Sequence, residues 1–293
     1  MQWKRLFAVL AFVVTLAAAG AQIRKIDPTL LGKATGGDAQ SQYLVGQAYL
    51  QGKGVEQDST QAAAWYQKAA AQGHAQAQYA LGALFHTGQG VAQSDAQAAA
   101  WYLKAANQGV AAAQLNLGAL YDHGEGVPQG YAQAAEWYRK AALQGNAEAE
   151  YNLGTLYERG LGVPQDYAQA LDLYRLAATA GNASAQFNLA LLYDNGEGVD
   201  RNYAEAAKWY NKAADQGVPR AQYNMGSMFV SGQGVPRDLV EAYYWLDLAA
   251  STWSGARQQE AISARDKVGA RLTAAQLFSA QQRASKWLAA HQK

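Results

Sequence analysis

Residues 77–109 read AQYALGALFHTGQGVAQSDAQAAAWYLKAANQG, and the pattern of this stretch recurs along the chain every 36 residues. One glycine position is filled in six copies: Gly52, Gly88, Gly124, Gly160, Gly196 and Gly232. Tryptophan keeps the same period at Trp65, Trp101, Trp137, Trp209 and Trp245, with Leu173 in the missing place. A fixed internal period is the signature of a repeat architecture. We therefore divide residues 37–252 into six units: 37–72, 73–108, 109–144, 145–180, 181–216 and 217–252.

Each unit predicts two helices joined by a glycine-rich loop. Over 75–86, Ala77, Leu81 and Leu84 share one face at 100° per residue. The Gly-x-Gly-Val loop that follows ends this helix, since glycine adopts positive φ at low cost. The second helix is expected to begin after a capping residue: Asp58, Ser94, Gly130, Asp166, Asn202 or Asp238. We expect its tryptophan ring to be buried against the small residues of the first helix, and such helix pairs to stack into an α-solenoid.

Three motifs resemble a known repeat family. The Leu-Gly pair at 81–82, the Gly-x-Gly-Val loop at 88–91 and the Trp-Tyr-x-Lys-Ala-Ala run at 101–106 are similar to those of Sel1-like repeats, relatives of the tetratricopeptide repeat. The resemblance implies an all-α fold, a right-handed α/α superhelix whose first helices line a concave, partner-binding side. The departures are Leu173 for Trp, Ala190 for a helical Gly, and Leu246 and Leu248 for Tyr and Lys.

The first residues have the form of an export signal. Lys4 and Arg5 precede an apolar run over 6–18, and small residues at 19–21 form a cleavage site near Ala21. We predict that residues 1–21 are a cleavable signal peptide and that the protein is periplasmic in a bacterium; an uncleaved N-terminal anchor is the alternative. Removing the two cations changes the formal net charge from +1 to −1. Residues 22–36 are expected to be a polar, partly flexible lead-in.

The end of the chain departs from the repeat. Residues 256–268 predict one helix, and a second is expected from Leu272 on, with a capping box formed by Thr273 and Gln276. Its apolar stripe includes Trp287, which we expect to pack on the sixth unit. Residues 253–293 are therefore predicted to be a C-terminal helical cap.

Composition and motifs argue against catalysis, cofactors and nucleic acid. There is no cysteine, so disulfides, thiolate metal sites and cysteine nucleophiles are excluded, and a net charge near zero does not suit a duplex-binding protein. The repeated Gly-x-Gly is read as a turn rather than a phosphate loop. Asp122, His123 and Glu125 are read as a solvated loop rather than a zinc site. We expect no catalytic residue, no metal, no cofactor and no stable membrane insertion after signal cleavage.

The candidate site is a row of rings and amides on the first helices. These positions point away from Leu81 and its equivalents: Tyr43, Tyr79, Asn116, Tyr151, Asn152, Phe187, Asn188, Tyr223 and Asn224. Aromatic rings supply contact area and amides can bind the backbone of a partner. The alternative is that the rings pack on one another and the asparagines only tie adjacent units together.

The functional expectation is a non-enzymatic, exported scaffold that binds another protein on the concave face. The resemblance implies adaptors of envelope assembly, signalling and host interaction, and also periplasmic immunity proteins that neutralise secreted toxins such as phospholipase effectors. The residues do not choose between these roles. Binding of peptidoglycan or another glycan through the rings is the alternative. A β-lactam-binding or β-lactam-hydrolysing enzyme, known among Cys-rich relatives, is the least favoured because this chain has no Cys.

Overall fold

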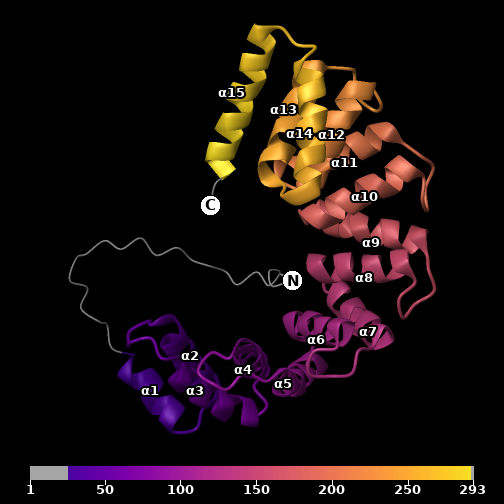
Figure 1. Cartoon of the computed structure of the whole chain (residues 1–293). Helices are drawn as coiled ribbons and strands as arrows, with labels where there is room; N and C mark the ends of the chain where they lie inside the picture. The colour runs from indigo at the N-terminus through magenta and orange to yellow at the C-terminus, as the bar shows by residue number, and fades with distance from the viewer. Residues whose placement is uncertain (1–25, 292–293) are drawn as a thin grey trace.

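The computed structural model describes residues 26–291, and Figure 1 shows this part of the chain as an open arc of helices. It holds fifteen α-helices and no strand among the described residues, which confirms the all-α solenoid. The helices are α1 Pro28–Thr35, α2 Ala39–Gln51, α3 Ser59–Ala71, α4 Ala75–Thr87, α5 Asp95–Asn107, α6 Ala111–His123, α7 Tyr131–Ala142, α8 Ala147–Arg159, α9 Tyr167–Thr179, α10 Ala183–Asn195, α11 Tyr203–Asp215, α12 Pro219–Ser231, α13 Leu239–Thr252, α14 Gly255–Gly269 and α15 Ala274–His291.

Each even-numbered helix from α2 to α12 pairs with the next helix, and it also packs on the helix before it. The predicted capping residues precede all six second helices, and Asp58 accepts hydrogen bonds from the backbone N–H groups of Thr60 and Gln61. Every first helix ends on a glycine in the left-handed conformation, for example Gly88 with φ 71°. The second glycine of the Gly-x-Gly-Val loop allows close contact between adjacent repeats. A Cβ on Gly90 would lie 2.2 Å from the carbonyl carbon of Ser59, so the loop touches the preceding repeat through its backbone.

The expectation about tryptophan is only partly correct. Trp209 and Trp245 are buried, but the tryptophans of the first three repeats are half-buried, and in the first four repeats the tyrosine at the next position fills the space at the helical glycine. A Cβ on Gly82 would lie 2.7 Å from the ring of Tyr102, and this tyrosine is fully buried. Trp101 is only half-buried and lies against the apolar cluster formed by α3 and α4. The ammonium of Lys104 lies over its ring, 4.0 Å from the ring centre. One residue corresponds to 100° around a helix, so neighbouring rings in the sequence face different surroundings.

Buried glutamines link the repeats in a way that the sequence did not reveal. This glutamine ladder consists of Gln42, Gln78, Gln114, Gln186 and Gln222. Each donates from Nε2 to the backbone carbonyl eight residues earlier, as Gln78 does to Ala70 over 3.1 Å. Its Oε1 in turn accepts from a residue thirty positions later, as from Gln108 over 2.7 Å. Buried amides paired in this way satisfy both polar atoms and fix the register of adjacent repeats.

Both ends of the solenoid are closed by added helices. α1 occupies part of the segment for which we expected a polar lead-in, and its Ala34 is buried. The predicted signal peptide lies outside the described residues. At the other end α14 and α15 form the helical pair, and Thr273 and Gln276 make the capping box. Trp287 of α15 approaches Gly217, just before α12. Within residues 26–291 no helix combines the length and the hydropathy needed to cross a membrane.

Candidate partner-binding face

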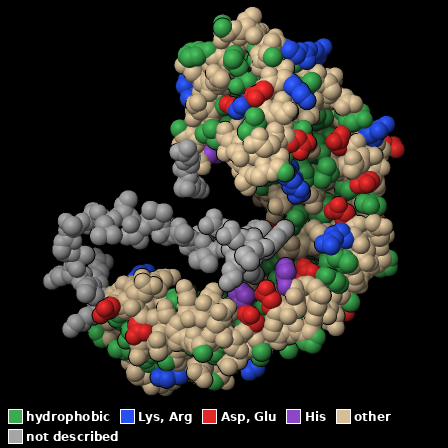
Figure 2. All heavy atoms as spheres, in the orientation of Figure 1, with side chains coloured by type: hydrophobic (Ala, Val, Ile, Leu, Met, Phe, Trp, Pro, Cys, Tyr) green, Lys and Arg blue, Asp and Glu red, His purple; other side chains and the backbone are tan. Residues whose placement is uncertain are grey.

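The first helices form the inner side of the arc. In Figure 1, α2, α4, α6 and α8 lie along the inner curve, while α3, α5 and α7 lie outside them. Figure 2 shows acidic and histidine side chains gathered on this inner curve over α4 and α6. The repeat places equivalent side chains at regular intervals along the curve, because each repeat contributes one first helix to it.

The rings predicted for the site lie in these helices, and each packs on an aromatic ring that follows it in the chain. Tyr79 contacts Tyr102 with ring centroids 5.8 Å apart. The same arrangement joins Tyr43 to Tyr66, Tyr151 to Tyr174, Phe187 to Tyr210 and Tyr223 to Trp253, at 5.5 to 5.9 Å. Phe187 is buried and the four predicted tyrosines are half-buried. The rings are therefore positioned by internal stacking, with part of each tyrosine left accessible.

The predicted asparagines lie beside tyrosine hydroxyls. Asn188 of α10 donates from Nδ2 to the hydroxyl of Tyr174 in the preceding repeat, over 3.1 Å. Asn224 lies close to the hydroxyl of Tyr210, and Asn116 lies close to the hydroxyls of Tyr79 and Tyr102 in the repeat before it. Part of the amide capacity is thus used to join repeats, as in the alternative interpretation. Asn152 occupies the same position of α8 and is half-buried.

A row of carboxylates is a further feature of this face. Asp122, Glu158 and Asp194, which we call the carboxylate row, occupy one position of the repeat near the ends of α6, α8 and α10. They accept hydrogen bonds from the hydroxyls of Tyr138, Tyr174 and Tyr210, sixteen residues later; two of these bonds measure 3.2 Å. Asp122 and His123, which we read as loop residues, lie instead in the last turn of α6. The row was missed because its donors belong to the following helix.

The electrostatics suit hydrogen bonding rather than proton transfer. Burial, and secondarily the adjacent carboxylate, raises the pKa of Tyr138, Tyr174 and Tyr210 far above the usual range, so these hydroxyls stay protonated donors. The carboxylates are half-exposed and retain oxygen lone pairs for other donors. Among residues 26–291 there is no cluster of acidic or histidine side chains fit to hold a metal ion.

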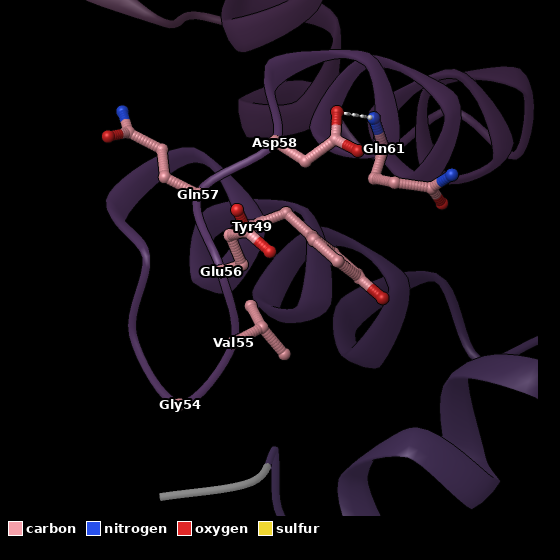
Figure 3. A pocket seen from close by; sticks show the side chains of 7 residues that line it. All are labelled: Tyr49, Gly54, Val55, Glu56, Gln57, Asp58 and Gln61. Carbon is pink, nitrogen blue, oxygen red and sulfur yellow. Dashed lines mark hydrogen bonds between the residues drawn. The ribbon is translucent and has the colours of Figure 1, made fainter. Parts of the chain in front are cut away.

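A further cavity lies at the other end of the solenoid from the C-terminal helical pair. It measures about 720 Å³ and is formed by Tyr49, the loop 54–58 and Gln61 of α3 (Figure 3). Figure 3 shows Gln57 directed away from Tyr49, and Asp58 bonded to the backbone of Gln61 as a helix cap. In the later repeats the corresponding loop packs on the preceding second helix, as Gly90 does on Ser59. No functional groups converge here, so we do not assign a site to this cavity.

Comparison with known proteins agrees with this architecture. The Sel1 repeat family model matches residues 39–74, 75–110, 111–146, 147–182, 183–218 and 219–251. Each match starts on the first residue of an even-numbered helix, two residues after the start of our units. The crystal structure of a Sel1 repeat protein from Oxalobacter formigenes is similar, with 34% identity and a TM-score of 0.64 over 72% of this chain and 84% of that chain.

More distant structures are also similar. The c5321 protective antigen of uropathogenic Escherichia coli, which has the same type of solenoid, shares 26% identity, with a TM-score of 0.46 over 88% of this chain and 86% of that chain. Immunity protein Pa5087 from Pseudomonas aeruginosa shares 22% identity, with a TM-score of 0.40 and 83% coverage of both chains. No curated protein matches the chain. The contiguous family matches over residues 39–251 show that this chain belongs to the Sel1 repeat family.

Proposed function

We propose that the protein is an exported, non-enzymatic scaffold that binds another protein along the inner curve of its solenoid. The observation that carries this proposal is the carboxylate row, which lies one repeat apart on α6, α8 and α10 and is held by buried tyrosines. A rigid row of acceptors flanked by half-buried rings fits the backbone and basic side chains of a partner. Repeat solenoids commonly use such extended concave surfaces for binding.

The cellular setting is part of the same proposal. The sequence motif at residues 1–21 supports export, with cleavage near Ala21, and the periplasm is the compartment that we propose. In that setting an immunity role, in which the partner is a secreted toxin, is one specific form of the scaffold function. We propose the general scaffold function, because no residue of the inner curve points to a toxin rather than to another protein as the partner.

Site-specific photo-crosslinking tests the position of the binding face. A photoreactive amino acid would replace Tyr151 on α8 and, as a matched control, the exposed Leu103 on α5, in the full-length exported protein. We expect a discrete crosslinked partner from Tyr151 and none from Leu103. Asp122→Asn and Glu158→Gln are then expected to weaken that crosslink, since they remove charge while keeping the shape of the side chains.

The opposite pattern contradicts the proposal. If the partner crosslinks from Leu103 with the same yield, or if Tyr151 yields nothing while the partner still co-purifies with the protein, the binding face is not the inner curve. The crosslinked protein, identified by mass spectrometry, also decides the immunity role: that role requires a secreted toxin whose activity falls when the two proteins are mixed.

A further inference from the structure

The fourth repeat borders a cleft lined by residues that differ from those of its sister repeats. It has a volume of about 230 Å³ and lies between α7, α8 and α9. Leu153, Leu173 and Leu176 form apolar walls, and Glu150 lines the same cavity. Leu143 and Leu176 at this cleft are 83% and 57% exposed, so its apolar surface continues into solvent. Exposed apolar surface of this kind marks interaction sites.

The cleft arises where the repeat has lost a tryptophan and a lysine together. In four sister repeats a lysine lies over the tryptophan three residues before it: Lys68 over Trp65, Lys104 over Trp101, Lys140 over Trp137 and Lys212 over Trp209, at 3.8 to 4.1 Å from the ring centre. In the fourth repeat the two positions are Leu173 and Leu176. The smaller side chain leaves space, and the cation of the repeat is absent there.

An acid replaces the ladder glutamine at the same place. Glu150 is only 6% exposed, and its side chain makes neither of the two ladder hydrogen bonds. An ionised carboxylate cannot donate to the backbone carbonyl of Ala142, and the residue thirty positions later is Ala180, which has no side-chain donor. Within residues 26–291 no enclosed side-chain oxygen lacks a hydrogen-bond partner, so the Glu150 carboxylate is open to the cleft that it lines. A carboxylate that is partly removed from water and has no protein donor is stabilised by a donor or a cation that enters the cleft.

Arg139, the other charged residue in the lining, does not pair with Glu150. Arg139 lines the cleft, but its Nη2 donates to the hydroxyl of Tyr157 over 3.1 Å, and no ion pair joins it to Glu150. Burial raises the pKa of Glu150, consistent with a carboxyl that lacks a charged partner in this state.

We propose that this cleft binds a lysine side chain of a partner protein, with the aliphatic stem between Leu173 and Leu176 and the ammonium on Glu150. The stem of lysine packs well on apolar walls while its compact ammonium bonds the carboxylate, and lysine is the cation that four sister repeats carry at the position of Leu176. The bound lysine would replace the internal cation that this repeat lacks. The site lies between α8 and the second helices α7 and α9, and its lining includes none of the residues of the candidate partner-binding face.

The test uses the whole protein and two small probes. N-acetyl-lysine methylamide carries the proposed group, and N-acetyl-norleucine methylamide has the same stem without the ammonium. With methyl-labelled leucine, we expect the lysine probe to shift the Leu173 and Leu176 signals with a Kd on the order of 1–10 mM, as befits a ligand of this size. The norleucine probe is expected to bind about tenfold more weakly, because a hydrogen bond to a charged group is lost.

Three variants make the fourth repeat more like its sisters. Glu150→Gln should weaken the lysine probe about tenfold and leave the norleucine probe unchanged. Leu173→Trp and Leu176→Lys should abolish binding, the first by filling the cleft and the second by supplying a cation internally. All three residues already occur at these positions in sister repeats, so thermal unfolding is expected to show a melting temperature no lower than that of the parent protein.

Several outcomes would overturn the proposal. Equal affinity for the two probes would mean that the ammonium is not recognised. An unchanged Kd for the lysine probe in Glu150→Gln would remove the carboxylate from the site. Shifts that do not saturate, or that map away from Leu173 and Leu176, would show that the cleft does not bind this group.

Discussion

The second and fourth repeats share one backbone plan and differ in the side chains that cover it. Both have the helical glycine, the buried tyrosine and the left-handed loop glycines: Gly82, Tyr102 and Gly90 in one, and Gly154, Tyr174 and Gly162 in the other. The second repeat fills its outer groove with Trp101 and Lys104, whereas the fourth has Leu173 and Leu176. The second buries Gln78 in the ladder, and the fourth buries Glu150.

This difference separates positions that make the fold from positions that make a surface. A Cβ added at the loop glycines Gly90 or Gly162 would lie within 3 Å of backbone atoms, so almost no other residue fits there. The helical position is less strict, since the fifth repeat has Ala190 there. The positions that differ lie where a smaller side chain leaves a cleft instead of a clash. A repeat protein can therefore vary its binding chemistry from unit to unit while the solenoid stays the same.

The largest effect on stability is expected from replacing the loop glycines by alanine, and we expect a similar loss in both repeats. In Gly90→Ala and Gly162→Ala a Cβ would lie 2.2 to 2.3 Å from backbone atoms in the second helix of the preceding repeat, at φ near +70°. We expect each to lose about 3 kcal/mol or more of unfolding free energy. Gly109→Ala is the control, since its φ is +86° but nothing lies within 4 Å; it should lose about 1 kcal/mol in urea denaturation. Equal losses in all three variants would contradict the packing argument.

Removing the hydroxyl of the buried tyrosine should cost more stability in the fourth repeat than in the second. Tyr174→Phe removes a hydroxyl that donates to Glu158 and accepts from Asn188, which leaves a carboxylate without its donor. We expect a loss of about 2 kcal/mol. For Tyr102→Phe a smaller loss of about 1 kcal/mol is expected, because the equivalent of Glu158 is the histidine His86. Paired denaturation curves check this, and a larger loss for Tyr102→Phe would show that the carboxylate row does not depend on its tyrosines.

The tryptophan position allows a side chain of one repeat to be introduced into the other. Trp101→Leu copies the fourth repeat into the second and removes half-buried aromatic area and the contact with Lys104. We expect a loss of about 1–2 kcal/mol. The reverse change, Leu173→Trp, should cost nothing and fill the cleft. Calorimetry of both variants checks this; destabilisation by Leu173→Trp would mean that the groove has already closed around leucine.

The smallest expected effect is the pH dependence of stability that Glu150 causes. Burial raises the pKa of folded Glu150 above its usual value of 4.5, so the folded state binds more protons than the unfolded state between these two values, and stability falls as pH rises through that interval. Glu150→Gln does not titrate and should be about 1 kcal/mol more stable at pH values above that interval, where the full cost of the ionised acid is present. The gap should shrink as pH falls towards 4.5 and below. A gap that is independent of pH would assign the effect to packing.

Local features were predictable from the sequence because they depend on neighbours in the chain. The 36-residue period, the capping residues of the second helices and the left-handed glycines were all read from spacing and residue type, and the structure agrees. Likewise Thr273 and Gln276 lie three residues apart, within one helical turn, and their capping box was expected. Backbone conformation at such positions is decided by sterics and short-range hydrogen bonds.

Only the tertiary structure decided which side chains meet across helices. Trp101 and Tyr102 are adjacent and both aromatic, and the helix rotation relative to Gly82 determines that the tyrosine is buried. The ladder joins residues 30 apart, and the carboxylate row meets its donors 16 residues away. Glu150 looks like any surface acid in the sequence, and its burial follows from the packing of α7, α8 and α9 around it. The period thus determined the solenoid, while contacts between helices determined its sites, because burial and hydrogen-bond partners depend on distances in space rather than along the chain.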